Sequence, residues 1–246
     1  MSAVVVVANV PWVPERVAYV EETKRRAAPL TVLVAEDDPP PNNGGCWSTV
    51  RKSLEMGLES GEEFVLCLAD DHVPCKVNFA EALAKINELI PARPVGLLLG
   101  SGRTADTGWD TGGHWVQASG WATGGGIVWP REMLADFLTW NDRNIPPTWF
   151  QDDTRFEAFW EHIGTAVWFS LPSLVEHEGW HSSVMGHTAA PGGRPRTAAA
   201  YIGEMDPLQI DWSLGVEDPP VARKGVRCRD WRRYAAEEAA RTGWTP

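Results

Sequence analysis

The chain has 246 residues, 43% of them hydrophobic, which is enough for one large α/β domain or two small ones with a sizeable core. Lys and Arg total 22 against 33 Asp and Glu, so the net charge is -11, and bulk attraction to DNA or to an anionic membrane is not expected. No run of about 18 apolar residues occurs, so the sequence predicts no membrane-spanning helix.

Strands and helices alternate through the first hundred residues. The segment 3–8 contains four consecutive valines at 4–7, which is typical of a central strand in a parallel sheet. Further along, apolar spacing predicts helices over 14–27, 48–59 and 79–89, and strands over 30–34, 64–69 and 94–99. This alternation indicates βαβ units and a mixed, mostly parallel, Rossmann-like sheet flanked by helices.

The start of the chain carries no basic segment, so we interpret it as a first strand and expect a cytoplasmic protein with reduced cysteines. No Gly-x-Gly-x-x-Gly motif follows the first strand, and no Gly-Lys-Ser/Thr loop occurs. The sequence therefore disfavours both the NAD-binding and the P-loop classes.

The second half is less regular. We predict an edge strand over 114–118, strands over 127–130 and 165–169, and helices over 131–140, 154–163 and 230–241. We expect one domain over 1–190, with a nucleotide-binding half over about 1–100 and an acceptor half over about 101–190. Residues 191–246 would be an irregular extension whose basic helix packs on that domain.

Two adjacent carboxylates end the apolar run at 64–69. Asp70 and Asp71 are followed by His72 and, after one residue, by Pro74, which we expect to stop the strand. Burying neighbouring carboxylates requires a positive partner, and Mg or Mn is the usual one. The alternative is a solvated turn without a ligand.

A second acidic pair, Asp152 and Asp153, precedes the helical spacing of 154–163. The helix dipole stabilises carboxylates at that position, and simple N-capping is the alternative explanation for them. The glycines Gly124, Gly125 and Gly126 precede a predicted strand, which indicates either close backbone approach to another group or a tight corner.

Taken together, these motifs resemble the nucleotide-sugar-dependent glycosyltransferases of the GT-A fold, most of all the small phage-encoded members. The resemblance covers about residues 3–187. The first feature is Asp70-Asp71 after a strand, followed by Cys75 and Phe79. The second is His177 after a late strand. The others are the segments 124–131, 151–154 and 179–187. The chain lacks the first Asp of a full DxD motif, because Leu68 and Ala69 precede the pair.

The resemblance implies a metal-dependent sugar transfer from a nucleotide-diphosphate sugar. Mn or Mg would be held by Asp71 and His177, with Asp70 either a third ligand or a partner of the ribose. Asp153, or failing that Asp152, would be the base in an inverting displacement, and a retaining outcome stays open. Residues expected to bind the donor nucleotide or sugar are Val10, Pro11, Glu36, Asp37, Asp70, Gly124 and Gly125.

The favoured acceptor is a hydroxymethylated pyrimidine in phage DNA, in which case the protein would act in the host cytoplasm. DNA would be contacted through a basic segment consisting of Arg223, Lys224, Arg227, Arg229, Arg232 and Arg233. A solvated helix is the alternative for these residues, and a saccharide or protein acceptor stays open.

A non-catalytic sugar- or nucleotide-binding protein is the competing hypothesis. A nucleotidyltransferase-like enzyme is disfavoured, because residues 9–13 carry no basic group.

Overall fold

The computed structural model describes residues 1–39, 45–100, 113–118, 126–149, 151–179, 197–221 and 231–245. Its elements in chain order are β1 (Ala3–Asn9), α1 (Pro14–Ala27), β2 (Thr31–Glu36), α2 (Cys46–Glu59), β3 (Phe64–Ala69), β4 (His72–Pro74), α3 (Phe79–Leu89), β5 (Val95–Gly96), β6 (Trp115–Ala118), β7 (Ile127–Pro130), α4 (Arg131–Asn144), α5 (Asp152–Ile163), β8 (Val167–Ser170), β9 (Val175–His177), the 3-10 turn η3 (Pro207–Gln209) and α6 (Trp231–Thr242). The alternation predicted from the sequence is confirmed, and α1 and α3 begin and end at the predicted residues.

A 7-stranded sheet forms the centre, with the strand order β2-β1-β3-β7-β5-β8-β6. β1 pairs in parallel with both β2 and β3, so the valine run is central as expected. β7 lies antiparallel between β3 and β5, and β6 lies antiparallel to β8 at the edge. The other strands share one direction, so the prediction of a mixed, mostly parallel sheet is confirmed.

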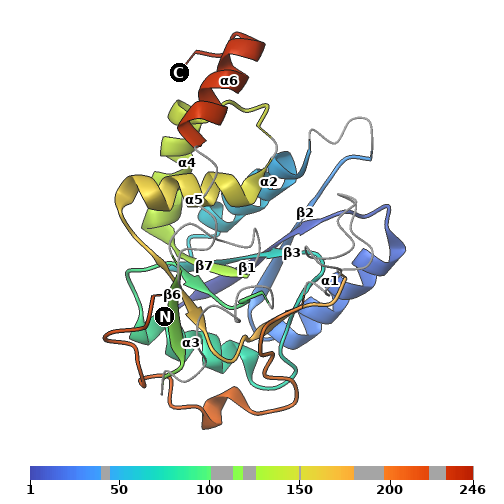
Figure 1. Ribbon diagram of the computed structural model, residues 1–246. Helices are drawn as coiled ribbons and strands as arrows, with labels where there is room; N and C mark the ends of the chain where they lie inside the picture. Colours follow the sequence, from blue (N-terminus) through green and yellow to red (C-terminus); the bar gives the residue numbers. More distant parts are fainter. Residues whose placement is uncertain are drawn as a thin grey trace.

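Helices cover both faces of this sheet (Figure 1). Because side chains alternate along a strand, Val4 and Val6 of β1 face one core, which includes residues of α2, α4, α5 and α6. Val5 and Val7 face the other core, formed with α1 and α3. Most of the described tryptophans belong to these cores, as predicted.

Two short segments differ from the prediction. The expected strand at 94–99 pairs in the large sheet only over Val95–Gly96, because Leu97 and Leu99 bond instead to residues outside its strands. The sequence predicts that Pro74 stops the strand of the acidic pair, but His72–Pro74 forms β4 in a separate 2-stranded sheet with β9. Pro74 is tolerated there as the last residue of a short edge strand.

At the C-terminus, α6 packs on the layer of α4 and α5. The rings of Trp231 and Trp140 are 5.4 Å apart, and Arg232 Nη1 lies 2.8 Å from Glu161 Oε1.

The division of the chain at residue 190 stays a prediction. Cys46, Cys67 and Cys75 are thiols, as expected, and Cys228 lies outside the described residues. None of the described helices is long and apolar enough to cross a membrane.

Candidate active site

The acidic pair lies at the carboxyl end of β3, where open α/β sheets commonly bind ligands. Asp70 and Asp71 are only 4% and 6% exposed, which excludes the solvated-turn alternative. Backbone contacts fix the pair from several sides: the Asp70 N–H donates to the Ala8 carbonyl at 3.1 Å, and the Asp71 carbonyl accepts from the Glu178 N–H at 2.9 Å. The end of β1 and the segment after β9 therefore meet at these two residues.

Arg16 of α1 supplies the positive charge that such a pair requires. Its Nη1 lies 2.8 Å from Asp70 Oδ1 and also contacts Asp71 Oδ2, and its Nη2 donates to the Gly179 carbonyl at 3.3 Å. Arg16 is itself 4% exposed. A guanidinium shared between two carboxylates is one solution to burying them, and the motifs in the sequence did not point to Arg16.

Two imidazoles complete the cluster. His72 and His177 are cross-strand partners in the β4–β9 pair, and their rings stand edge to face at 5.0 Å. His177 Nε2 lies 2.8 Å from Asp71 Oδ2, and His72 Nε2 lies 3.9 Å from Asp71 Oδ1. The structure thus places in direct contact Asp71 and His177, the two metal ligands implied by the resemblance, with His72 beside them.

Burial and charge shift the acids of this cluster in opposite directions. Burial raises the pKa of Asp70 to about 6 despite the charge of Arg16. Burial acts on Asp71 in the same sense, but the hydrogen bond with His177 and the neighbouring positive charges hold the pKa of Asp71 well below its usual range. Burial also lowers the pKa of His72 to about 4, so this imidazole is neutral at neutral pH.

The donor set fits a divalent metal ion. The ligand atoms of Asp71, His72 and His177 all lie within 4.8 Å of one another, and two ligands of one ion lie at most about 4.4 Å apart, so small movements suffice. Neutral imidazole is the form that binds metals, and His72 Nδ1 is buried with no hydrogen-bond partner among the described residues. Two imidazoles with one carboxylate suit Mn²⁺ and other transition ions better than Mg²⁺.

Asp70 lies next to this group with both carboxylate oxygens engaged. Oδ1 accepts from Arg16, and Oδ2 accepts from the Val10 N–H at 2.8 Å. The expected donor-binding residues at the ends of β1 and β2 lie on the same edge, since Asn9 pairs with Glu36 and the Asp37 N–H donates to the Asn9 carbonyl at 2.9 Å. Pro11 and Asp37 are half-buried and Glu36 is exposed.

Part of the expected site falls outside the described residues. The candidate residues outside the described ranges are Gly124, Gly125, His181 and His187. At Gly126 the backbone has φ +78°, and an added Cβ would meet Leu98 Cβ at 3.1 Å. The close approach expected for the glycine run is thus present at Gly126, where the neighbour is Leu98.

The second acidic pair begins α5 on the other face of the sheet. Asp152 Oδ1 lies 3.9 Å from the thiol of Cys46, the first residue of α2, and the charge of Asp152 also reaches Cys67 in β3. Since α2 follows β2, its first residue lies near the carboxyl edge of the sheet. Burial, followed by the charge of Asp153, raises the pKa of Asp152 to about 6.

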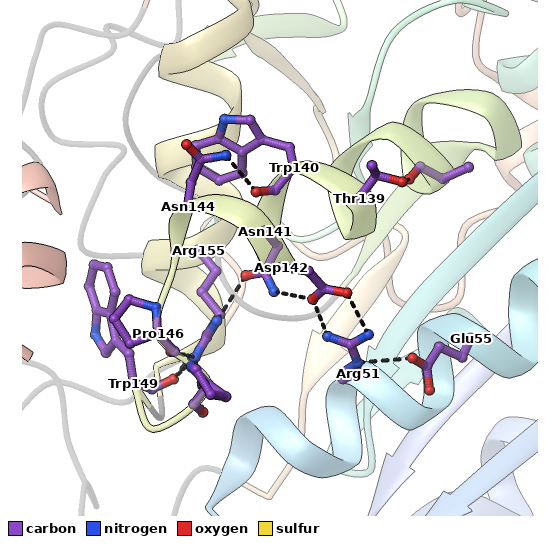
Figure 2. Close-up of polar contacts among 12 residues, drawn as sticks. Arg51, Glu55, Thr139, Trp140, Asn141, Asp142, Asn144, Pro146, Trp149 and Arg155 are labelled. Atoms are coloured by element: carbon purple, nitrogen blue, oxygen red, sulfur yellow. Dashed lines mark hydrogen bonds and ion pairs between the residues drawn. The ribbon is translucent and has the colours of Figure 1, made fainter. Parts of the chain in front are cut away.

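A buried cation holds the loop that leads to this pair (Figure 2). Arg155 has no exposed surface and donates to the carbonyls of Pro146 and Trp149, each at 2.9 Å, and to Asn141 Oδ1 at 2.8 Å. Its guanidinium also lies 4.4 Å from the centre of the Trp47 ring. No hydrogen bond or ion pair between described residues joins Asp152 to Asp70, Asp71 or His177.

Fold and site together define an α/β protein with a carboxylate–imidazole cluster at the carboxyl edge of its sheet. No protein-family model matches the sequence, and a comparison with curated proteins finds no relative. One similar solved structure is that of A197 from STIV, with a TM-score of 0.45 and 15% identity, covering 72% of this chain and 85% of that chain. Another is a glycosyltransferase involved in the glycosylation of the major capsid of PBCV-1, with a TM-score of 0.34 and 11% identity, covering 96% of this chain and 100% of that chain. At these TM-scores neither similarity assigns a function to this chain.

Proposed function

We propose that the protein is a metal-dependent glycosyltransferase of GT-A type, which moves a sugar from a nucleotide-diphosphate sugar to a hydroxyl acceptor. The observation that carries the proposal is the buried group of Asp71, His72 and His177 at the carboxyl edge of the sheet. A second acid, Asp152, reaches the same edge from the other face. This pairing of a metal-type site with a separate carboxylate is what such a transfer needs.

Each residue of the cluster has a proposed part. Asp71, His72 and His177 hold the ion, and we favour Mn²⁺ over Mg²⁺ because imidazoles supply two of the ligands. When bound, the ion neutralises the leaving diphosphate as a Lewis acid. Asp70 stays outside the ligand set, because the Arg16 guanidinium and the Val10 N–H occupy its oxygens.

A carboxylate acts as the general base for the acceptor hydroxyl. The acceptor oxygen bonds to the anomeric carbon, its proton passes to the carboxylate, and the bond to the diphosphate breaks with its electron pair leaving on the diphosphate. Asp152, with a pKa of about 6, is ionised at neutral pH yet basic enough to accept a proton, so we place it ahead of Asp153. Asp153 Oδ1 accepts the Thr154 N–H at 2.7 Å, so this carboxylate already serves the first turn of α5.

The nucleotide and acceptor assignments extend the proposal further. The half-buried ends of β1 and β2, with Val10, Pro11, Glu36 and Asp37, would hold the base and ribose, and Gly124 and Gly125 would flank the sugar. Hydroxymethylated pyrimidine in DNA is the proposed acceptor, with a saccharide or a protein as the alternatives. A non-catalytic protein that binds a nucleotide sugar through the same edge is the second candidate function.

The test is a panel of nucleotide sugars with Mn²⁺, scored first for a rise in melting temperature and then for slow hydrolysis or transfer. We expect Asp71→Asn to abolish the Mn²⁺-dependent rise. Asp152→Asn should keep the rise and lose at least about 100-fold in turnover, a typical loss for a missing general base. Asp153→Asn is the comparison, and Asp136→Asn on an exposed face of α4 is the control.

The outcomes separate the candidates. Ligand binding without metal and without turnover would favour the non-catalytic protein. Full turnover in both Asp71→Asn and Asp152→Asn would show that the reaction occurs elsewhere. Transfer to hydroxymethylated DNA, but not to plain DNA, would support the proposed acceptor.

A further inference from the structure

The guanidinium of Arg16 and the proposed metal ion need the same carboxylate. Asp71 Oδ2 contacts Arg16 Nη1 and also lies 2.8 Å from His177 Nε2. A ligand oxygen bound to a metal cannot keep both contacts in their present form. An ion bound at Asp71 therefore competes with the guanidinium of Arg16 for the charge of this carboxylate.

Arg16 has other partners besides Asp71 that hold its guanidinium in place. Asp70 Oδ1 lies 2.8 Å from its Nη1, and the Gly179 carbonyl accepts from its Nη2 at 3.3 Å. α1 also holds Arg16 in place, because Val20, Thr23 and Ala27 continue the same buried stripe of the helix. The guanidinium is therefore held beside the ion site.

The charges decide what this fixed cation does. Two adjacent carboxylates, each less than 10% exposed, repel one another strongly when no positive charge lies between them. Among the described side chains in contact with them, Arg16 is the one whose positive charge is permanent. A divalent ion placed on Asp71 would in turn be repelled by Arg16.

We propose that Arg16 is an internal counter-cation that stands in for the metal at the acidic pair and competes with the metal for Asp71. This inference rests on the metal site of the proposed function. It implies that Arg16 keeps the metal-free protein folded and weakens metal binding at the same time. The opposite arrangement, in which Arg16 orients Asp71 for the metal, predicts the reverse sign for metal affinity.

The experiment compares Arg16→Met with Arg26→Met. Arg26 also lies on α1 and is mostly buried, but it donates to the Pro74 carbonyl at 2.8 Å and does not touch the acidic pair. Melting temperatures are measured in EDTA and in Mn²⁺, and Mn²⁺ affinity is measured by titration with detection of the free ion by electron paramagnetic resonance. Neither readout depends on turnover.

We expect Arg16→Met to melt lower than the parent in EDTA and to gain more from Mn²⁺ than the parent does. Its Mn²⁺ affinity should rise on the order of tenfold, the effect of removing one charge about 5 Å from a divalent ion even with water-like screening. Arg26→Met should gain the same increment as the parent. An equal or smaller increment in Arg16→Met, with a normal gain in the parent, would overturn the role of Arg16 and leave the metal site standing.

A second comparison covers the case in which Arg16→Met does not fold. The double variant Asp70→Asn with Arg16→Met removes one charge of each sign, and the amide oxygen introduced at position 70 can still accept from the Val10 N–H. It should fold and bind Mn²⁺ more tightly than Asp70→Asn alone, and equal affinities would contradict the competition. If neither the parent nor any variant responds to Mn²⁺, the metal site and the competition are both wrong.

Discussion

Asp152 carries a half-buried carboxyl group that ionises less readily in the folded state than in the unfolded state. Its pKa of about 6 lies above the usual 3.8, so the folded state holds its proton more tightly than the unfolded state does. The stability due to this group is therefore complete below about pH 4 and is lost as the pH rises through 6. We predict that Asp152→Asn is more stable than the parent by about 1–3 kcal/mol at pH 7.5, with no difference near pH 4.

Urea unfolding of parent and variant at the two pH values measures this difference. Asp136→Asn, an exposed acid on α4, should show no such pH dependence. A parent that is more stable than Asp152→Asn at pH 7.5 would mean that the ionised carboxylate has a favourable partner. A carboxyl group with a raised pKa beside a ligand-binding edge is typical of functional sites.

Gly179 is a residue-scale test of how tightly the cluster is packed. An added Cβ would lie 2.6 Å from Asp71 Cβ and 3.1 Å from Tyr19 Cε2, distances that require both neighbours to move. We predict that Gly179→Ala lowers stability by about 1–3 kcal/mol and reduces the Mn²⁺-dependent rise in melting temperature. Gly100→Ala is the control, because its Cβ would meet nothing within 4 Å. An unchanged Mn²⁺ response in Gly179→Ala would show that Asp71 need not keep its present position.

At the scale of single elements, α1 shows where sequence patterns mislead. Its bounds were predictable, because Pro14 is typical of a first helical position and the apolar spacing then continues. Its buried stripe does not consist of apolar residues alone, since Val17 is 40% exposed whereas Arg16 faces the core. The signal was present: Arg16 precedes Val20, Thr23 and Ala27 by 4, 7 and 11 positions, so a charged residue lay on the inward face.

The loop between α4 and α5 is held by Arg155, and its loss is predicted to be costly. Arg155→Met would leave the carbonyls of Pro146 and Trp149 without this donor inside the protein. We expect it to lower the free energy of unfolding by about 2–4 kcal/mol in urea. Arg51→Met is the matched control, because its ion pair with Asp142 joins α2 to α4 at a partly exposed position (Figure 2), where about 0–1 kcal/mol is typical. Equal losses of stability in the two variants would show that the contribution of Arg155 to the free energy of unfolding does not come from its burial.

At the scale of the whole molecule, local patterns predicted most elements but not how strands meet. The sheet follows from alternation along the chain, whereas the position of β7 between β3 and β5 is a non-local pairing that no local signal records. The same holds for the site. Asp71 and His177 were named from the resemblance, but His72 and His177 come together because β4 pairs with β9 in register. Arg16 reaches the acidic pair because it lies on the inward face of α1.

The distribution of charge over the molecule leads to the last prediction, which concerns DNA. The net charge of -11 opposes binding of plain duplex, so affinity at physiological salt should be weak. Within the basic segment, the described arginines already have acidic partners: Arg232 lies 2.8 Å from Glu161 Oε1, and Arg233 lies 3.7 Å from Glu237 Oε1. Each phosphate contact adds about 0.9 to the slope of log affinity against log salt. We therefore expect Arg232→Gln with Arg233→Gln to reduce that slope by less than one, measured by fluorescence anisotropy at low salt. A reduction near two would mean that both ion pairs open on DNA, and that the phosphate backbone competes successfully with Glu161 and Glu237 for these side chains.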